Sequence, residues 1–217
     1  KKLTPSQLAL LRLLALIMGD ADTPEIEKAF KLEPGLTVNL LRLTNSVSSG
    51  LSTRITSLRH AITLLGRRQL QRWLQLLIYT SPRADAPTSP LLTLAATRGR
   101  LMELFAEKVQ PGQRDFAEQA FMVGIMSLIP ALLGMTMADI LEQLPVAPRV
   151  REALLEGNGP LGRLLALATA TEQSAQEATD EALAAARQAF PELNARVIGT
   201  SLAEAMSWAN NLEREND

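Results

Sequence analysis

The chain has 217 residues, of which 47% are apolar and 21% are charged. These values predict a folded protein with a sizeable core and exclude a disordered or fibrous chain. The chain contains no cysteine and a single histidine, His60. The count alone excludes disulfide frameworks, cysteine-based zinc sites, thiol nucleophiles and metal centres built on several histidines. A formal net charge of −1 argues against binding nucleic acid through the charge of the whole chain.

The small net charge hides an uneven distribution along the sequence. Residues 1–110 carry 15 basic and 8 acidic side chains, a net +7, whereas residues 111–217 carry 7 and 15, a net −8. No carboxylate lies between Glu33 and Asp85, and that stretch contains seven arginines, Arg42, Arg54, Arg59, Arg67, Arg68, Arg72 and Arg83. Either the basic half packs against the acidic half of the same molecule, or the basic stretch faces an anion or an acidic partner.

The predicted elements are all helices, because no stretch alternates β-branched with polar residues. Leu10, Leu13, Leu14 and Ile17 recur at helical spacing, which predicts an amphipathic core helix and not a signal peptide. Four further helices are predicted before residue 80, with breaks near Gly50 and Gly66 and a cap at Ser57. Their approximate ranges are 24–33, 36–47, 58–65 and 67–79.

The composition of residues 81–90 predicts a linker, and helices resume after it. They are expected over 91–109, 114–129, 137–144 and 148–155, after Pro160, and over 177–190 and 191–213. We therefore predict one all-α, compact multi-helix domain over residues 1–217. It would have an N-terminal lobe of about 1–80, the linker, and a C-terminal lobe of about 91–217.

Residues 119–138 contain no charge and are long enough to span a bilayer. Pro130 interrupts this stretch, and no lysine or arginine flanks it to set an orientation. We expect a buried central helix that ends near Pro130 and is followed by a short turn. No membrane contact is predicted, and the cytoplasm is the expected compartment.

Catalytic motifs are absent from the sequence, which has neither a glycine-rich phosphate loop nor a nucleophile elbow. No catalytic group, metal or cofactor is therefore predicted, and Glu103 and Glu107 are interpreted as part of a charged helical surface. Residues 57–77 have the outline of a helix-turn-helix with a glycine turn. A nucleic-acid-binding regulator that uses the arginines of residues 54–83 is one alternative, although the overall acidity argues against nucleic acid as a partner.

Several motifs together resemble the HDOD domain, the HD-related output domain of bacterial signalling proteins. They are Glu33–Leu36, Leu40–Ser46, Ile55–Gly66, Trp73, Arg98 with Glu103, Ala120–Leu128, Ile140–Pro145 and Ala205–Ala209. The sequence resembles the output half of EAL–HDOD proteins, in which an EAL domain of the cyclic di-GMP phosphodiesterase type precedes the HDOD domain. The resemblance implies an HD-like helical fold.

The resemblance also bears on catalysis, because active HD phosphohydrolases hold metal with a His…His-Asp…Asp set. Ser127-Leu128 stand in the apparent place of the His-Asp pair, and these side chains cannot hold a divalent cation. The resemblance therefore implies a non-catalytic signalling and protein-interaction module. The implied partners are an EAL-type cyclic di-GMP domain in cis or in trans, other signalling proteins, or a second copy of the chain. A degenerate HD domain that senses an anionic nucleotide is a further alternative.

The candidate partner-contact residues are Arg42, Asn45, Ser46, Arg59, Arg67, Arg68, Arg72 and Trp73. For some of these a structural role is an equally concrete expectation. Asn45-Ser46 at a helix end is suited to capping backbone groups, and Arg42 could pair with the acidic half. Trp73 and Trp208 are expected to anchor the core or an interface and not to stack on bases.

Overall fold

The computed structural model describes residues 4–80, 89–172, 184–185, 188–212 and 214. The described residues form helices and no strand, which confirms the all-α prediction. The chain divides into two compact units. The first unit contains residues 1–92, 129–146 and 210–217, and the second contains 93–128 and 147–209. Residues 81–88 of the predicted linker and most of the predicted 177–190 helix lie outside the described residues. The organisation as one domain with two lobes stays a prediction.

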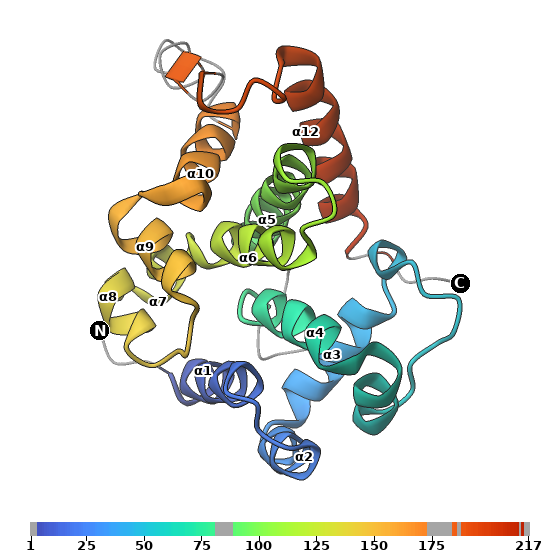
Figure 1. Cartoon of the computed structure of the whole chain (residues 1–217). Helices are drawn as coiled ribbons and strands as arrows, with labels where there is room; N and C mark the ends of the chain where they lie inside the picture. Colours follow the sequence, from blue (N-terminus) through green and yellow to red (C-terminus); the bar gives the residue numbers. More distant parts are fainter. Residues whose placement is uncertain (1–3, 81–88, 173–183, 186–187, 213, 215–217) are drawn as a thin grey trace. The chain divides into compact units, whose positions relative to one another are not determined.

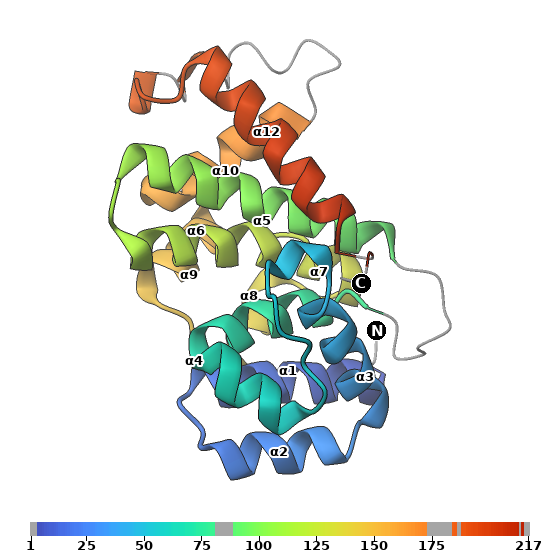
Figure 2. The same ribbon diagram turned by 90° about the vertical axis from the view of Figure 1, so that its right-hand side faces the viewer.

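The first unit is a bundle in which α1 packs on α2 and α4, and α3 packs on α2 and α4 (Figures 1 and 2). Its elements are α1 (Pro5–Met18), α2 (Thr23–Lys31), α3 (Pro34–Thr44), the short 3-10 helix η1 (Val47–Ser49), α4 (Leu58–Leu77), α7 (Ile129–Leu133) and α8 (Met137–Leu141). The four aliphatic positions predicted for the first helix, Leu10, Leu13, Leu14 and Ile17, are all buried. The helical spacing therefore identified the core face of α1.

The junctions around α3 and α4 follow the local sequence. Ser57 caps α4, because its Oγ accepts a hydrogen bond from the His60 amide at 3.1 Å. Gly66 interrupts α4 with a φ of 70°, a conformation that favours glycine. The two predicted helices, 58–65 and 67–79, are thus confirmed as two halves of one broken helix. The predicted 36–47 helix is corrected: α3 ends at Thr44, and Val47 begins η1.

The second unit is built from α5 (Pro90–Val109), which starts in the first unit, and from α6 (Arg114–Met126), α9 (Pro148–Glu156), α10 (Gly159–Glu172) and α12 (Ala195–Asn210). Within it, α6 packs on α9 and α10, and α9 packs on α10 (Figure 1). The helix predicted over 191–213 is shorter than expected. It begins at Ala195, because Asn194 accepts a hydrogen bond from the Val197 amide and so caps the helix there.

Two glycines allow α5 and α6 to cross at close range. A Cβ atom added to Gly124 would lie 2.7 Å from the Cα of Gly99 and 2.8 Å from the carbonyl oxygen of Arg98. Any larger residue at position 124 would push the helices apart. The crossing places Arg98 of α5 beside the last turn of α6.

The apolar segment Arg114–Leu133 is the one described stretch long and apolar enough to cross a membrane. In the structure it is two helices, and most side chains of α6 from Phe116 to Met126 are buried in the protein. The prediction of a buried helix is correct, but its end is not. The helix stops at Met126, and Pro130 lies in the first turn of α7, where proline is tolerated.

Candidate functional site

The basic segment, defined as residues 36–83, presents several arginines on the surface of the first unit. Arg42, Arg54 and Arg68 are exposed, and Arg72 is half-buried. Arg83 lies outside the described residues. On α3 the exposed side chains Val38 and Arg42 are one helical turn apart, so an apolar and a cationic group share one face.

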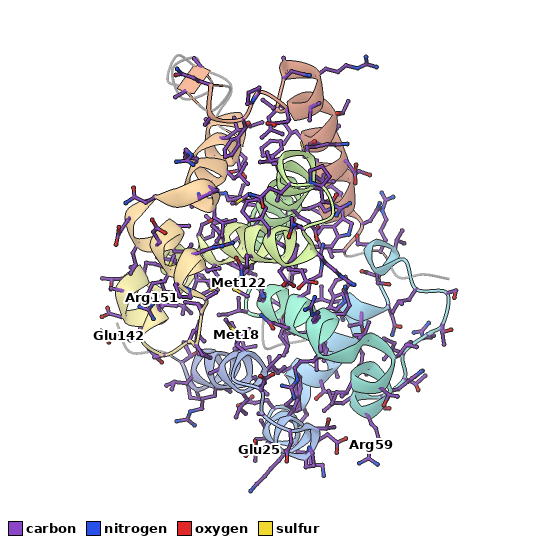
Figure 3. All side chains as sticks on the ribbon, in the orientation of Figure 1. Met18, Glu25, Arg59, Met122, Glu142 and Arg151 are labelled. Carbon is purple, nitrogen blue, oxygen red and sulfur yellow. The ribbon has the colours of Figure 1, made fainter. Side chains whose placement is uncertain are left out.

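Arg59 forms a bidentate ion pair with Glu27 of α2. Its Nε and Nη2 atoms donate to the two carboxylate oxygens at 3.0 and 3.1 Å. This hydrogen bonding lowers the pKa of Glu27 and raises the pKa of Arg59. Figure 3 shows Arg59 on the outer surface near the start of α4. Because Arg59 already has an acidic partner, its contact with a second protein would compete with Glu27.

Arg67 is half-buried and caps the end of α1. Its Nη1 donates to the carbonyl oxygen of Ile17 at 3.3 Å, and its Nη2 donates to the carbonyl oxygen of Ala21. The Asp20 carboxylate lies 3.8 Å from its Nε. The break at Gly66 immediately precedes this residue. A cation at a helix C-terminus satisfies carbonyl groups that lack helical partners, so Arg67 has a structural role here.

Asn45 and Ser46 hold the turn between α3 and α4. The Asn45 side chain donates to the carbonyl oxygen of Ile55 and accepts from its amide, both at 2.7 Å. Ser46 is buried, and its Oγ donates to the carbonyl oxygen of Leu43 at 2.7 Å. Both side chains are therefore engaged with backbone groups of the same unit, as the capping interpretation expected.

The two tryptophans and the histidine have structural surroundings. Trp73 is buried within the first unit. Trp208 of α12 packs edge-on against Phe121 of α6, with ring centroids 6.1 Å apart. His60 is half-buried, and its Nδ1 accepts a hydrogen bond from the Thr56 amide at 3.4 Å. Of the candidate contacts, Arg42, Arg59 and Arg68 are exposed, and Trp73 is buried.

The structure brings together a buried ion pair that the sequence did not single out as a site. Arg98 of α5 contacts Glu172 at the end of α10 through three hydrogen bonds of 2.6 to 3.1 Å. Its Nη1 also donates to the Oγ of Ser127 at 2.9 Å, and that hydroxyl donates to the carbonyl oxygen of Gly124 at 2.7 Å. The side chains of Arg98 and Glu172 are each 11% exposed. A guanidinium therefore lies beside the serine that follows α6.

A second arginine of α5 links that helix to α12. Arg100 donates to Glu103 at 2.6 Å and to Glu204 at 2.7 Å. Burial works to lower the pKa of Arg100, but the hydrogen bonds and charges of the two carboxylates outweigh it, so the pKa is raised. Glu103 is buried, which corrects its interpretation as part of a charged helical surface. It is a partner for Arg100 within the core of the second unit.

Within the described part of the chain, no group of three or more His, Cys, Asp or Glu side chains is placed to hold a metal ion. In the helix-turn-helix interpretation, Arg59 and Arg67 would contact nucleic acid, but Arg59 pairs with Glu27 and Arg67 caps α1.

The HDOD domain family matches residues 5–153, more than half of the chain. The chain belongs to the HDOD family. This confirms the resemblance carried by the motifs between Glu33 and Pro145. The matched range includes α1 to α8 and most of α9.

Two curated relatives are much longer than the region they share with this HDOD chain. A cyclic di-GMP phosphodiesterase of Vibrio cholerae, CdgJ, is 32% identical over 148 residues, which are 68% of this chain and 34% of the relative. The protein YuxH of Bacillus subtilis is 27% identical over 179 residues, 82% of this chain and 41% of the relative. The chain therefore spans less than half the length of these relatives.

The fold is also similar to that of a solved structure. A crystal structure from Shewanella amazonensis, described as that of a phosphohydrolase, superposes with a TM-score of 0.56 at 18% sequence identity. The similarity covers 97% of this chain and 94% of that protein. At this level of identity the comparison supports the all-α fold and carries no statement about activity.

Proposed function

We propose that this HDOD chain is a non-catalytic output module of cyclic di-GMP signalling that acts in the cytoplasm through contacts with other proteins. The partner would be an EAL-type cyclic di-GMP domain, in cis or in trans. The similarity to CdgJ, named as a cyclic di-GMP phosphodiesterase, supports this signalling context. The shared region covers only part of that relative, which is compatible with catalysis residing in another part of it.

The observation that carries the proposal is the position of Arg98. Its guanidinium donates to Ser127, the residue that stands in the apparent place of the HD histidine. A fixed positive charge at this point repels a divalent cation, and Glu172, the nearest carboxylate of the network, is already neutralised by it. All three guanidinium nitrogens donate to protein acceptors. An anionic nucleotide at Arg98 would therefore meet the Glu172 carboxylate beside the guanidinium.

The test of the non-catalytic role is an assay of phosphodiester and nucleotide hydrolysis by the chain with Mn²⁺, Mg²⁺ or Fe²⁺. We expect no turnover above buffer and no tight metal binding by calorimetry. Turnover that disappears in Arg98→Met or Ser127→Ala, while circular dichroism shows the variant folded, would contradict the proposal.

The docking surface proposed for the partner includes the exposed arginines Arg42 of α3 and Arg68 of α4 in the basic segment. Charge reversal there should weaken binding to an acidic protein surface, because rim charges steer association and exclude like charges. We expect Arg42→Glu with Arg68→Glu to reduce capture of an EAL-type domain at least tenfold. The matched control is Arg196→Glu, an exposed arginine of α12. If the double variant and the Arg196→Glu control lost equal affinity for the EAL-type domain, the docking surface would lie elsewhere.

Binding of DNA is the outcome that separates the proposal from the nucleic-acid alternative. A regulator of that kind would bind duplex DNA with an affinity that falls steeply as salt rises. We expect a gel-shift titration at low salt to show no complex.

A further inference from the structure

Helix α3 carries apolar side chains on both of its faces. Its buried leucines, which lie in the core of the first unit, are Leu36, Leu40 and Leu43. On the opposite side Pro34 and Val38 are exposed, and Leu41 is half-buried. A helix at the surface of a globular domain normally presents charged and polar side chains to solvent. In α3, Arg42 is the only charged residue of 11, so its outward face is unusually apolar.

The outward residues of α3 have the spacing by which helices pack side by side. Pro34, Val38 and Leu41 follow one another after four and three residues, so they form one stripe along the helix. Figure 2 shows α3 leading from the end of α2 toward η1. Leu32, just before α3, is 77% exposed, and Val47, just after it, is 40% exposed. An apolar stripe thus runs along α3, with one exposed apolar residue beyond each end.

Two charged side chains of opposite sign lie near the ends of this stripe. Glu33 immediately precedes α3, is half-buried, and forms no capping hydrogen bond with the helix. Arg42 is exposed in the last turn. At a rise of about 1.5 Å per residue, Glu33 lies about 7.5 Å from Val38 in one direction and Arg42 about 6 Å in the other. A surface of this kind is complementary to itself when it is turned end for end.

We propose that the outward face of α3 pairs with the same face of a second copy of this chain, in antiparallel orientation about Val38. In that arrangement Arg42 of each copy lies beside Glu33 of the other, and twofold symmetry makes the contact twice. Val38 packs on its own counterpart, and Pro34 of one copy packs on Leu41 of the other. The start of each helix meets the end of its partner, where the flanking apolar residues extend the contact.

The charges of the stripe favour a second copy as its occupant. Because the stripe carries both signs of charge, a complementary surface must carry both signs in the reverse order. A second copy meets this condition by symmetry. The contact is small, since a helix of 11 residues is about 16 Å long. Stable interfaces bury about 1,200–2,000 Å², so we expect a weak dimer that forms at high concentration.

The pairing does not rest on the proposed function, and its test uses the chain alone. Where both hold, they compete, because Arg42 belongs to the face of α3 and to the docking surface proposed for an EAL-type domain. Dimerisation then regulates the access of that domain to one of its two arginines. A chain that forms dimers but captures no EAL-type domain would contradict only the proposed function.

The first experiment measures self-association of the full chain by analytical ultracentrifugation at concentrations up to about 1 mM. We expect the mean mass to rise from 23.6 kDa toward twice that value. Val38→Glu places two carboxylates against each other on the symmetry axis and should weaken the dimer at least tenfold. The matched control is Leu64→Glu, because Leu64 is 44% exposed on α4, outside this face. The proposal is overturned if the chain stays monomeric, or if Val38→Glu weakens the dimer no more than Leu64→Glu does.

The second experiment tests the antiparallel orientation by exchanging charges. Arg42→Glu and Glu33→Arg each bring like charges together at both contacts, so each variant alone should self-associate about tenfold more weakly. Mixed in equal amounts, the two variants have complementary ends, and we expect a heterodimer at least as stable as the unchanged dimer. Arg68→Glu makes the same charge change on α4 and should leave self-association within about twofold.

Circular dichroism of each variant checks that the helices are retained. In a parallel pair each charge would face its own counterpart, so a single reversal would not weaken the dimer. Unchanged self-association of Arg42→Glu and Glu33→Arg therefore contradicts the antiparallel pairing. A mixture that associates no better than the separate variants also overturns it.

Discussion

The two units use their arginines in opposite ways. In the second unit Arg98 and Arg100 are largely buried, and each contacts carboxylates at 2.6 to 2.7 Å. In the first unit Arg42 and Arg68 are exposed, and Arg59 is 79% exposed although it pairs with Glu27. Buried ion pairs fix the packing of helices, whereas exposed cations remain exchangeable between internal and external partners. Burial therefore separates the structural arginines from the candidate contacts, and charge does not.

The charge contrast between the two halves of the sequence is weaker between the two units of the structure. Grouped by unit, the first has 13 basic and 11 acidic residues, and the second has 9 and 12, so the contrast between halves shrinks to +2 against −3. Arg98 and Arg100 belong to the basic half but pair with Glu172 and Glu204 of the acidic half. Arg59, in contrast, finds its partner Glu27 within the basic half. Internal pairing thus accounts for part of the basic stretch.

The largest expected effect comes from breaking the buried pair in the second unit. Arg98→Met leaves Glu172 buried without its cation, which should lower the free energy of unfolding by roughly 3–5 kcal/mol. The measurement is urea unfolding followed by circular dichroism. Arg68→Met in the first unit is the matched control and should change the value by less than about 0.5 kcal/mol.

The double variant separates the loss of the pair from the cost of an orphaned charge. Arg98→Met with Glu172→Met replaces both ions by apolar groups, and we expect it to recover most of the stability lost in the single variant. If Arg98→Met and Arg68→Met were equally stable, the contrast between buried and exposed arginines would be wrong.

The helix crossing that positions Arg98 gives the next largest effect. Gly124→Ala places a Cβ 2.7 Å from the Cα of Gly99, and overpacking of this kind costs roughly 1–3 kcal/mol. Gly199 of α12 is the control, because a Cβ there meets nothing within 4 Å. Gly199→Ala should stabilise the chain by roughly 0.5–1 kcal/mol through its higher helix propensity. Thermal unfolding of the two variants, with shifts of opposite sign, is the check.

The sequence predicted the helices well because their signals are local. Apolar spacing, the Ser57 cap and the break at Gly66 each act within a few residues, and all are present in the structure. The end of the central helix was misplaced because Pro130 is compatible with the first turn of a new helix.

The ion pair of Arg98 with Glu172 could not be predicted from local sequence patterns, because the two residues are 74 positions apart in the sequence. The family motif had marked Arg98 but could not name its partner. Only the crossing at Gly99 and Gly124 brings α5 against the end of α6. The pairing of Arg67 with carbonyl oxygens was hidden for the same reason, because backbone acceptors leave no trace in composition.

A smaller effect is expected at the turn of the first unit. Asn45→Ala removes two hydrogen bonds to the buried Ile55, and we expect a loss of roughly 1–2 kcal/mol in the free energy of unfolding by urea. Arg42→Ala, one turn earlier on α3, is the control and should be nearly neutral. If Asn45→Ala left the free energy of unfolding unchanged, the structural role of Asn45 would be wrong, and a contact with a partner would be the better interpretation.

The smallest effect concerns the exposed pair of Arg59 with Glu27. Hydrogen bonding to Arg59 lowers the pKa of Glu27, so the pair stabilises the fold above the ordinary pKa of a glutamate, and this contribution is lost as the pH falls through the lowered value. Carboxyl-carbon NMR should show the pKa of Glu27 rising in Arg59→Gln and staying constant in the control Arg68→Gln. High salt should reduce the difference, because exposed charges are screened. If the pKa of Glu27 did not move in Arg59→Gln, the ion pair would contribute nothing in solution. Arg59 would then be available to an external carboxylate.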